Sequence, residues 1–393
     1  MNTALQIRKV AANGMAARVL LAFLTTAGLY YVNIMPALVD GLKQGLGFTN
    51  QQAGLVGSLN VYGAACGAFV IAFFVRRLNW KWAAQLLLLG LIGMDLLSML
   101  LGDPLALAGV RFVHGTIGGM LVGVGFSIIA RTRAPDRTFG MLLLVQAGAG
   151  GLGVMSLPLL VPILGPRVLF AALIGFSALT LVMLQFLPDF PVLADAPRAP
   201  GAAGAERGRL RTRMLLLALL SVFLFQAANM GLYAFIIGLG RNAGLEMTFI
   251  SPTLGISNWF GMLGALLVVV LSTRFGILTP IVGGMILTIV GTAALAYSEV
   301  KWVWIVSNVG VAITWNFVIA YLLGMCARFD RTGQAAVWGG FASKMGLASG
   351  PLLASFILGE DHYLVLIAMA VALLVVGTVA SASPASRLDR GTV

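Results

Sequence analysis

Long apolar segments alternate with short polar stretches along the whole chain. Apolar segments lie near residues 17–39, 53–75, 82–101, 105–130, 138–164, 167–187, 213–238, 248–272, 277–297, 302–326, 333–358 and 362–382. A helix needs about 20 apolar residues to cross the hydrocarbon core of a bilayer, whereas membrane strands would show shorter stretches of alternating hydrophobicity. The pattern therefore predicts an all-α membrane protein with twelve transmembrane helices.

One polar interruption is much longer than the others. Residues 189–213 read DFPVLADAPRAPGAAGAERGRLRTR, which is rich in proline, alanine and glycine and ends in closely spaced arginines. Such a composition is typical of a linker. We therefore predict an N-terminal six-helix bundle over residues 1–188, a cytoplasmic linker over 189–212 and a C-terminal six-helix bundle over 213–393.

The two predicted bundles share an internal repeat. An offset of 197 residues relates Arg77 to Arg274, Gly67 to Gly264 and Gly153 to Gly350. Two pseudo-symmetric bundles are typical of secondary transporters, which hold their substrate between the halves near the middle of the membrane.

The composition agrees with this pattern and leaves little room for an enzyme. Hydrophobic residues make up 60% of the chain and charged residues 10%, against roughly 25% charged in a soluble domain. Cys66 and Cys326 have no suitably spaced cysteine or histidine partner, so neither a disulfide nor a metal site is expected. No Walker loop or catalytic cluster occurs, so we predict neither enzymatic activity nor a cofactor.

The basic residues predict the orientation of the chain. With both termini inside, 19 of the 25 Lys and Arg residues fall on the inner side, 4 on the outer side and 2 within spans. This asymmetry predicts a multi-pass protein of the cytoplasmic (inner) membrane with both termini in the cytoplasm. The net charge of +12 then faces anionic lipid headgroups of the bilayer, and no nucleic acid partner is expected.

Three short motifs suggest a family. Residues 72–81 read AFFVRRLNWK, residues 272–276 read STRFG, and residues 111–119 read RFVHGTIGG. Together with the six-plus-six pattern, they resemble the Major Facilitator Superfamily. Arg77 and Arg274 match the family's gating-loop arginines, but Arg76 and Thr273 stand where the family has an aspartate.

The resemblance implies that the first, fourth, seventh and tenth spans line a central cavity. Each of these spans carries polar or aromatic side chains on one helical face. The candidates for substrate binding are Tyr30 and Asn33; Arg111; Gln226, Asn229 and Tyr233; and Asn308, Trp315 and Asn316. Hydrogen bonds between helices are the alternative role for such residues.

Two cations lie within the predicted spans, Arg111 in the fourth and Lys344 in the eleventh. Only Asp95, in the third span at a similar depth to Arg111, offers an acid within a span. An Arg111–Asp95 pair would leave Lys344 alone for the substrate. We therefore predict that Lys344, alone or with Arg111, binds a small organic anion, most simply a carboxylate. A neutral, packed lysine is the alternative.

Aromatic side chains would cover the apolar part of that anion. Besides Tyr30, Tyr233 and Trp315, we predict this role for Trp338.

A proton-coupled carrier also needs a group that titrates, and His114 and Asp95 are the candidates. The predicted function is secondary transport of an organic anion by alternating access, as symport if protons are coupled, by a protein acting as a monomer. The alternatives are a proton-driven exporter of lipophilic compounds and a sensor without transport activity.

Overall fold

A computed structural model describes residues 9–75, 77–190, 205–271, 274–329, 334–359 and 361–391. The described secondary structure is entirely helical. Eleven segments are long and apolar enough to cross a bilayer, and the shorter apolar helix Met15–Ala27 begins the first predicted span. The prediction of twelve spans is therefore confirmed. Arg76, Thr273 and residues 191–204 of the predicted linker lie outside the described residues.

The first half of the chain contains α1 to α8. Their bounds are Met15–Ala27 (α1), Tyr30–Asn33 (α2), Met35–Leu46 (α3), Asn50–Phe74 (α4), Trp80–Ser98 (α5), Pro104–Ile129 (α6), Pro135–Leu164 (α7) and Arg167–Leu184 (α8).

The second half contains α9 to α16. Their bounds are Ala205–Ala234 (α9), Ile236–Asn242 (α10), Met247–Phe260 (α11), Met262–Leu271 (α12), Leu278–Ala294 (α13), Lys301–Arg328 (α14), Gln334–Leu358 (α15) and Tyr363–Asp389 (α16), with a 3-10 turn at Leu295–Tyr297.

Local sequence explains where several helices begin. Thr49 and Gln52 form a capping box at the start of α4, in which each side chain accepts from the backbone N–H of the other residue. The side chain of Asp103 accepts from Ala106 N at 2.7 Å, and Pro104 occupies the first turn of α6. These caps satisfy N–H groups that would otherwise lie unpaired at the helix ends.

Three predicted spans are interrupted rather than continuous, which corrects the predicted helices at 17–39, 213–238 and 248–272. The first span comprises α1, α2 and α3, the seventh α9 and α10, and the eighth α11 and α12. Pro36 explains the break at Ile34, because proline cannot donate the backbone hydrogen bond that a continuous helix needs. The breaks at Phe235 and Gly261 have no comparable local cause.

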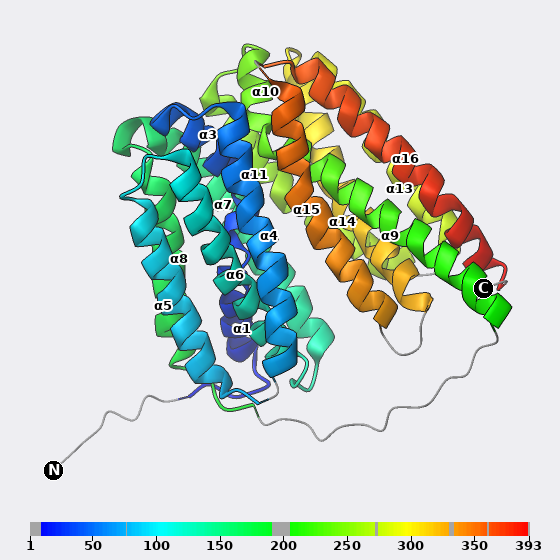
Figure 1. Ribbon diagram of the computed structural model, residues 1–393, viewed down its shortest axis with the longest axis horizontal. Helices are drawn as coiled ribbons and strands as arrows, with labels where there is room; N and C mark the ends of the chain where they lie inside the picture. Colours follow the sequence, from blue (N-terminus) through cyan, green and yellow to red (C-terminus); the bar gives the residue numbers. More distant parts are fainter. Residues whose placement is uncertain are drawn as a thin grey trace.

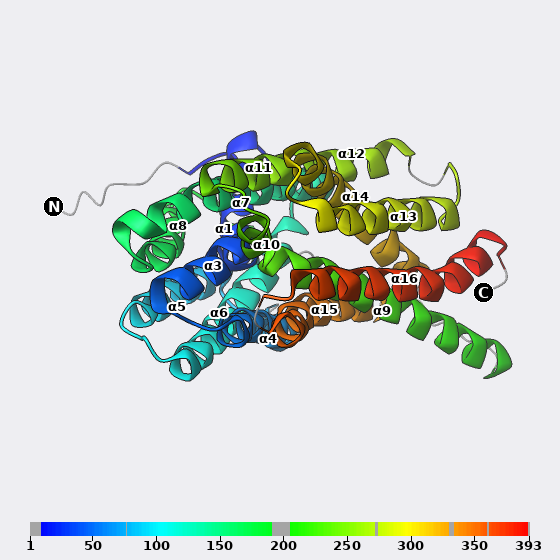
Figure 2. The same cartoon turned by 90° about the horizontal axis from the view of Figure 1, so that it is seen from above.

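The helices form two groups that lean together at one end and diverge at the other (Figure 1). Helices α1 to α8 form one group and α9 to α16 the other. We call the end near the two chain termini the terminal side and the opposite end, where α3 and α10 meet, the distal side. Seen from above, α7 lies beside α11, and α4 lies beside α15 (Figure 2).

Equivalent contacts in the two halves support the internal repeat. A Cβ atom on Gly67 of α4 would collide with the carbonyl oxygen of Thr116 in α6, and one on Gly264 of α12 would collide with that of Ile313 in α14. The offset of 197 residues that relates Gly67 to Gly264 also relates Thr116 to Ile313. Both halves therefore use a glycine at the same place to bring two backbones together.

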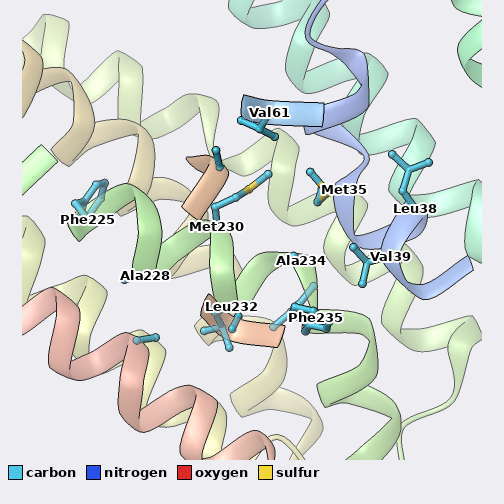
Figure 3. Close-up of a cluster of buried hydrophobic side chains, with 14 of the residues drawn as sticks. Met35, Leu38, Val39, Val61, Phe225, Ala228, Met230, Leu232, Ala234 and Phe235 are labelled. Carbon is cyan, nitrogen blue, oxygen red and sulfur yellow. The ribbon is translucent and has the colours of Figure 1, made fainter. Parts of the chain in front are cut away.

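The two halves share one buried hydrophobic cluster. Met35 and Val39 of α3 face Ala234 and Phe235 of the second half, with Met230 beside them (Figure 3). All five side chains are at most 2% exposed. Burial of this apolar surface holds the halves together on the distal side.

Close backbone approach strengthens this contact. A Cβ atom on Gly255 of α11 would lie 2.7 Å from the carbonyl oxygen of Gly151 in α7, and one on Gly151 would lie 2.8 Å from that of Gly255. Only glycine fits on both sides of such a crossing.

Ion pairs also join the halves on the distal side. Arg241 of α10 lies 3.0 Å from Asp40 of α3, and Lys43 of α3 lies 3.6 Å from Asp361, which precedes α16. The amide of Asn50 donates to Asp361 Oδ1 at 3.1 Å and to the carbonyl oxygen of Gly359 at 2.8 Å. Asp40 is 6% exposed, so its pair is shielded from solvent.

Candidate substrate cavity

A cavity of about 700 Å³ lies between the two halves, on the terminal side of the Gly151–Gly255 crossing. Its lining comes from both halves, and the residues are Leu29, Val32, Asn33, Phe139, Gly140, Leu143, Leu144, Gln146, Ala147, Gly150, Gln226, Tyr233, Asn258, Met262, Ala265, Leu266, Val269, Ala312, Trp315, Asn316 and Ile319. A cavity of this size suits a small organic molecule.

A hydrogen-bonded network of uncharged side chains fixes part of this lining. Trp315 Nε1 donates to Gln226 Oε1 at 2.6 Å, and Gln226 Nε2 donates to Ser343 Oγ at 2.8 Å. Asn258 Nδ2 donates to the Tyr233 hydroxyl at 2.9 Å, and the Tyr233 and Trp315 rings lie 5.9 Å apart. These contacts hold two aromatic rings and two amides in fixed positions.

Two further amides in the lining keep unused hydrogen-bonding groups. Asn33 Nδ2 is buried without a hydrogen-bond partner, and the Gln146 side chain makes no hydrogen bond with the described residues. The break at Ile34 follows Asn33 directly and so places this side chain at the end of the short helix α2. A buried amide without a partner is costly unless a ligand or water satisfies it.

None of the described residues that line the cavity carries a formal charge. The structure therefore brings together Asn33, Gln226, Tyr233, Trp315 and Asn316 among the predicted substrate-binding residues, but neither Lys344 nor Arg111.

Arg111 is fully buried in an ion pair, which is the alternative that the sequence left open. Its Nη1 lies 2.7 Å from Asp95 Oδ1, and its Nη2 donates to the carbonyl oxygen of Met94 at 3.0 Å and to Ser98 Oγ. The guanidinium also lies over the Phe170 ring at 5.2 Å. Arg111 is therefore paired within the first half, although its Nε and the Oδ2 of Asp95 are buried without a hydrogen-bond partner among the described residues.

The same cluster fixes the tautomer of His114. Asn60 Nδ2 donates to the carbonyl oxygen of Arg111 at 3.0 Å, so the group that faces His114 Nδ1 at 2.9 Å is a donor. His114 Nδ1 must then accept, and the ring proton of the neutral form lies on Nε2, which is 3.4 Å from Asp95 Oδ1. The hydrogen bonds of this cluster thus fit a neutral imidazole.

Four other predicted substrate-binding residues lie away from the cavity lining. Tyr30 is stacked on Phe176 at 4.6 Å, and Trp338 is 55% exposed. Asn229 and Asn308 donate their side-chain amides to the carbonyl oxygens four residues earlier in their own helices, at 2.8 and 2.9 Å.

Lys344 lies half-buried in α15 and lines no part of the cavity. Its ammonium group forms no hydrogen bond or ion pair with the described residues.

The gating-loop candidates Arg77 and Arg274 are both exposed in loops, where neither forms an ion pair with a described residue. The described parts of these loops thus show no ion-pair latch of the kind that an aspartate would give.

The sequence did not identify Gln146 of α7 and Asn258 of α11 as cavity residues. The prediction considered the first, fourth, seventh and tenth spans only, whereas the fifth and eighth spans also line the cavity. A signal was present, because each of these residues is an amide side chain within a strongly apolar segment.

Two helical bundles around a central cavity define a carrier protein, and the family can be stated as well. The sequence matches the profile of the Major Facilitator Superfamily over residues 19–351, which shows that the chain belongs to this family. It is a multi-pass membrane protein and a secondary transporter. No match was found among curated protein sequences.

Solved structures of other transporters share this fold. The nucleoside transporter NupG has a TM-score of 0.74 and 15% identity, with 93% of this chain and 98% of that chain covered. A bacterial homolog of the human lysosomal transporter Spinster, inward-facing and unoccupied, has a TM-score of 0.70 and 13% identity over 97% and 99%. A D-xylose–proton symporter has a TM-score of 0.64 and 14% identity over 92% and 96%.

The buried Arg111–Asp95 pair predicts a large effect on stability. The Asp95→Ala variant leaves Arg111 as an uncompensated buried charge, so its unfolding free energy should fall by roughly 3–5 kcal/mol. The double variant Asp95→Leu/Arg111→Met removes both charges and should unfold at a higher temperature than Asp95→Ala. Thermal unfolding in detergent measures both, and a double variant less stable than Asp95→Ala would contradict the pairing.

Proposed function

We propose that this transporter carries a small, uncharged polar organic molecule through the cavity between its halves. The observation that carries the proposal is the uncharged lining: among the described residues of the cavity, amide and aromatic side chains supply all the polar side-chain groups. An ionised substrate would lose its hydration there without gaining a counter-charge, and this is costly at low dielectric.

The arrangement of the lining supports a specific mode of binding. The Tyr233 and Trp315 rings offer flat apolar faces for a ring or carbon skeleton. Asn33 and Gln146 have hydrogen-bonding groups left for hydroxyl or amide groups of the substrate. Two of the structures with this fold are named as carriers of nucleosides and of D-xylose, which are uncharged and rich in hydroxyl groups.

An organic anion is the second candidate, and Lys344 is the observation that favours it. Its ammonium group has no partner among the described residues, and an arriving carboxylate would supply one. In this proposal the anion binds beside α15 and not among the amides of the cavity.

Variants separate the two candidates. In proteoliposomes, Gln226→Ala should reduce uptake of the uncharged substrate by about tenfold or more, because it removes a hydrogen-bonding group and releases Trp315. Lys344→Ala should leave that uptake unchanged. The substrate itself comes from a thermal-shift screen of purified protein against neutral, anionic and cationic metabolites.

An anion carrier would give the opposite result in each of these measurements. If anions alone stabilise the protein, and Lys344→Ala abolishes uptake while Gln226→Ala retains it, the proposal of an uncharged substrate is wrong. Thermal unfolding of each variant controls for loss of the fold.

We also propose the orientation and the direction of opening. The excess of basic residues on the terminal side supports a cytoplasmic location for both termini, in a cytoplasmic (inner) membrane. The cavity lies on that side of the Gly151–Gly255 crossing, so the arrangement corresponds to the inward-facing state of a carrier that works by alternating access as a monomer.

The cluster of Asp95, Arg111 and His114 is our candidate for proton coupling. It is buried in the first half, and Tyr31 of α2 contacts both His114 and Arg111, with centroid distances of 5.9 and 5.7 Å. Asn33, two residues after Tyr31, lines the cavity. A proton on His114 would give Nδ1 a hydrogen that opposes the Asn60 amide, and the resulting shift can reach the cavity through Tyr31.

The His114→Gln variant tests this coupling. Glutamine keeps a donor and an acceptor and cannot titrate, so the variant should fold and exchange substrate normally. Its uptake should lose the dependence on an imposed pH gradient. A pH-gradient response equal to that of the wild type would exclude His114.

A further inference from the structure

One wall of the cavity is formed by two helices that separate from each other. Helix α7 crosses α11 at Gly151 and Gly255, but α12 turns away at Gly261 and hardly contacts α7. Instead α12 packs on α14 through Gly264, which is the one buried residue of α12. A slot therefore runs between α7 and α12 on the terminal side of the crossing.

The side chains along this slot are apolar and accessible. Leu143 and Leu144 of α7 and Leu266 and Val269 of α12 all line the cavity. Their exposed fractions are 46%, 50%, 57% and 76%. The four side chains thus belong to the same cavity as the hydrogen-bonded side chains of Gln226, Trp315, Tyr233 and Asn258, which we call the amide network. The four side chains themselves offer no hydrogen-bonding group.

The slot also lies at the depth of the hydrocarbon core. Leu144 is seven residues inside the span Arg137–Leu164, or about 10 Å from its terminal-side end at 1.5 Å per residue. Leu266 lies five residues from the end of the span Met247–Leu271. Leu144 and Leu266 therefore lie at a depth where hydrocarbon, and not lipid headgroups, surrounds the helices.

We propose that the transported molecule is amphipathic: its uncharged polar head binds the amide network, and its hydrocarbon part lies in the α7–α12 slot, which opens to the bilayer interior. This inference rests on the proposed function, because it uses the same polar site for the head. The apolar part is the occupant that matches the exposed leucine and valine side chains, since its transfer from water onto them is favourable.

The two ends of the cavity differ in chemistry, and an amphipathic molecule matches both of them. Gln226 and Trp315 are held by hydrogen bonds at the polar end, so they discriminate the head. The slot has no hydrogen-bonding group, so it selects for apolar character and tolerates variation in length. Access from the bilayer would let such a molecule reach the cavity without crossing the aqueous phase.

A labelling experiment tests whether the slot is open to the bilayer. Single cysteines at Leu266 and, as the matched control, at Leu267 are labelled with a nitroxide in a Cys66→Ser/Cys326→Ala background and reconstituted in phosphatidylcholine liposomes. Leu267 is adjacent, 43% exposed and outside the cavity lining. Both labels should relax faster with oxygen than with a water-soluble nickel chelate. Faster relaxation with the nickel chelate at Leu266 alone would show a water-filled slot and overturn the proposal.

A ligand series tests the class of substrate. Ethyl, butyl and hexyl glucosides and the corresponding glycerol ethers, below their micellar concentrations, are added to the full-length protein in lipid nanodiscs, and binding is followed by thermal shift. From ethyl to hexyl, affinity should rise by about tenfold or more in the wild type and in Leu267→Trp. Leu266→Trp fills the slot and should abolish this dependence on chain length.

The outcomes distinguish this inference from the proposed function. Gln226→Ala should weaken binding of every member of the series to a similar extent, because it acts on the head. Binding that needs Gln226 but ignores chain length overturns the amphipathic substrate and leaves the proposed function intact. If affinity still depends on chain length in Leu266→Trp, the hydrocarbon part does not bind in the slot. If chain length matters equally with and without Gln226, and Gln226→Ala weakens no member of the series, the compounds bind as they would to lipid and the proposal is wrong.

Discussion

Helices α7 and α11 come close enough at Gly151 and Gly255 for their backbones to touch. A side chain at either position would meet the opposite backbone at less than 3 Å, so the two halves can close on the distal side only because both residues are glycine. The crossing leaves the helices free to diverge on the other side, where the cavity lies. The distal ion pairs and the shared hydrophobic cluster act at the same end, and they reinforce a closure that the backbone contact makes sterically possible.

Polar groups serve two separate purposes in this protein. In the first half, Asp95 and Arg111 neutralise each other away from the cavity, and their pairing makes burial of both charges tolerable. In the cavity, amide and aromatic groups remain uncharged, and some hydrogen-bonding capacity is left unused. A site of this kind selects an uncharged molecule by hydrogen bonding and shape, and it excludes ions through the cost of their desolvation.

The sequence predicted the spans well because hydrocarbon thickness sets their length. It offered an Arg111–Asp95 pair as one alternative, because both residues lie at a similar depth. It could not predict which polar residues reach the cavity. Asn229 and Asn33 both lie on a polar helical face, yet Asn229 bonds to its own backbone while Asn33 stands at a helix break. Helical periodicity shows on which face of a helix a residue lies. Which residues line the cavity depends also on how the two halves tilt and on where the helices break. The unpaired state of Lys344 among the described residues agrees with the sequence, whereas its distance from the cavity lining depends on tertiary packing.

A crystal structure of the protein with its transported molecule bound would show directly whether an uncharged substrate binds the amide network between the halves. In that structure, the polar part of the molecule should lie against Trp315 and Gln226, with hydrogen bonds to Asn33 or Gln146. A charged molecule held by Lys344, with the amide network empty, would show that the substrate is not an uncharged one bound between the halves.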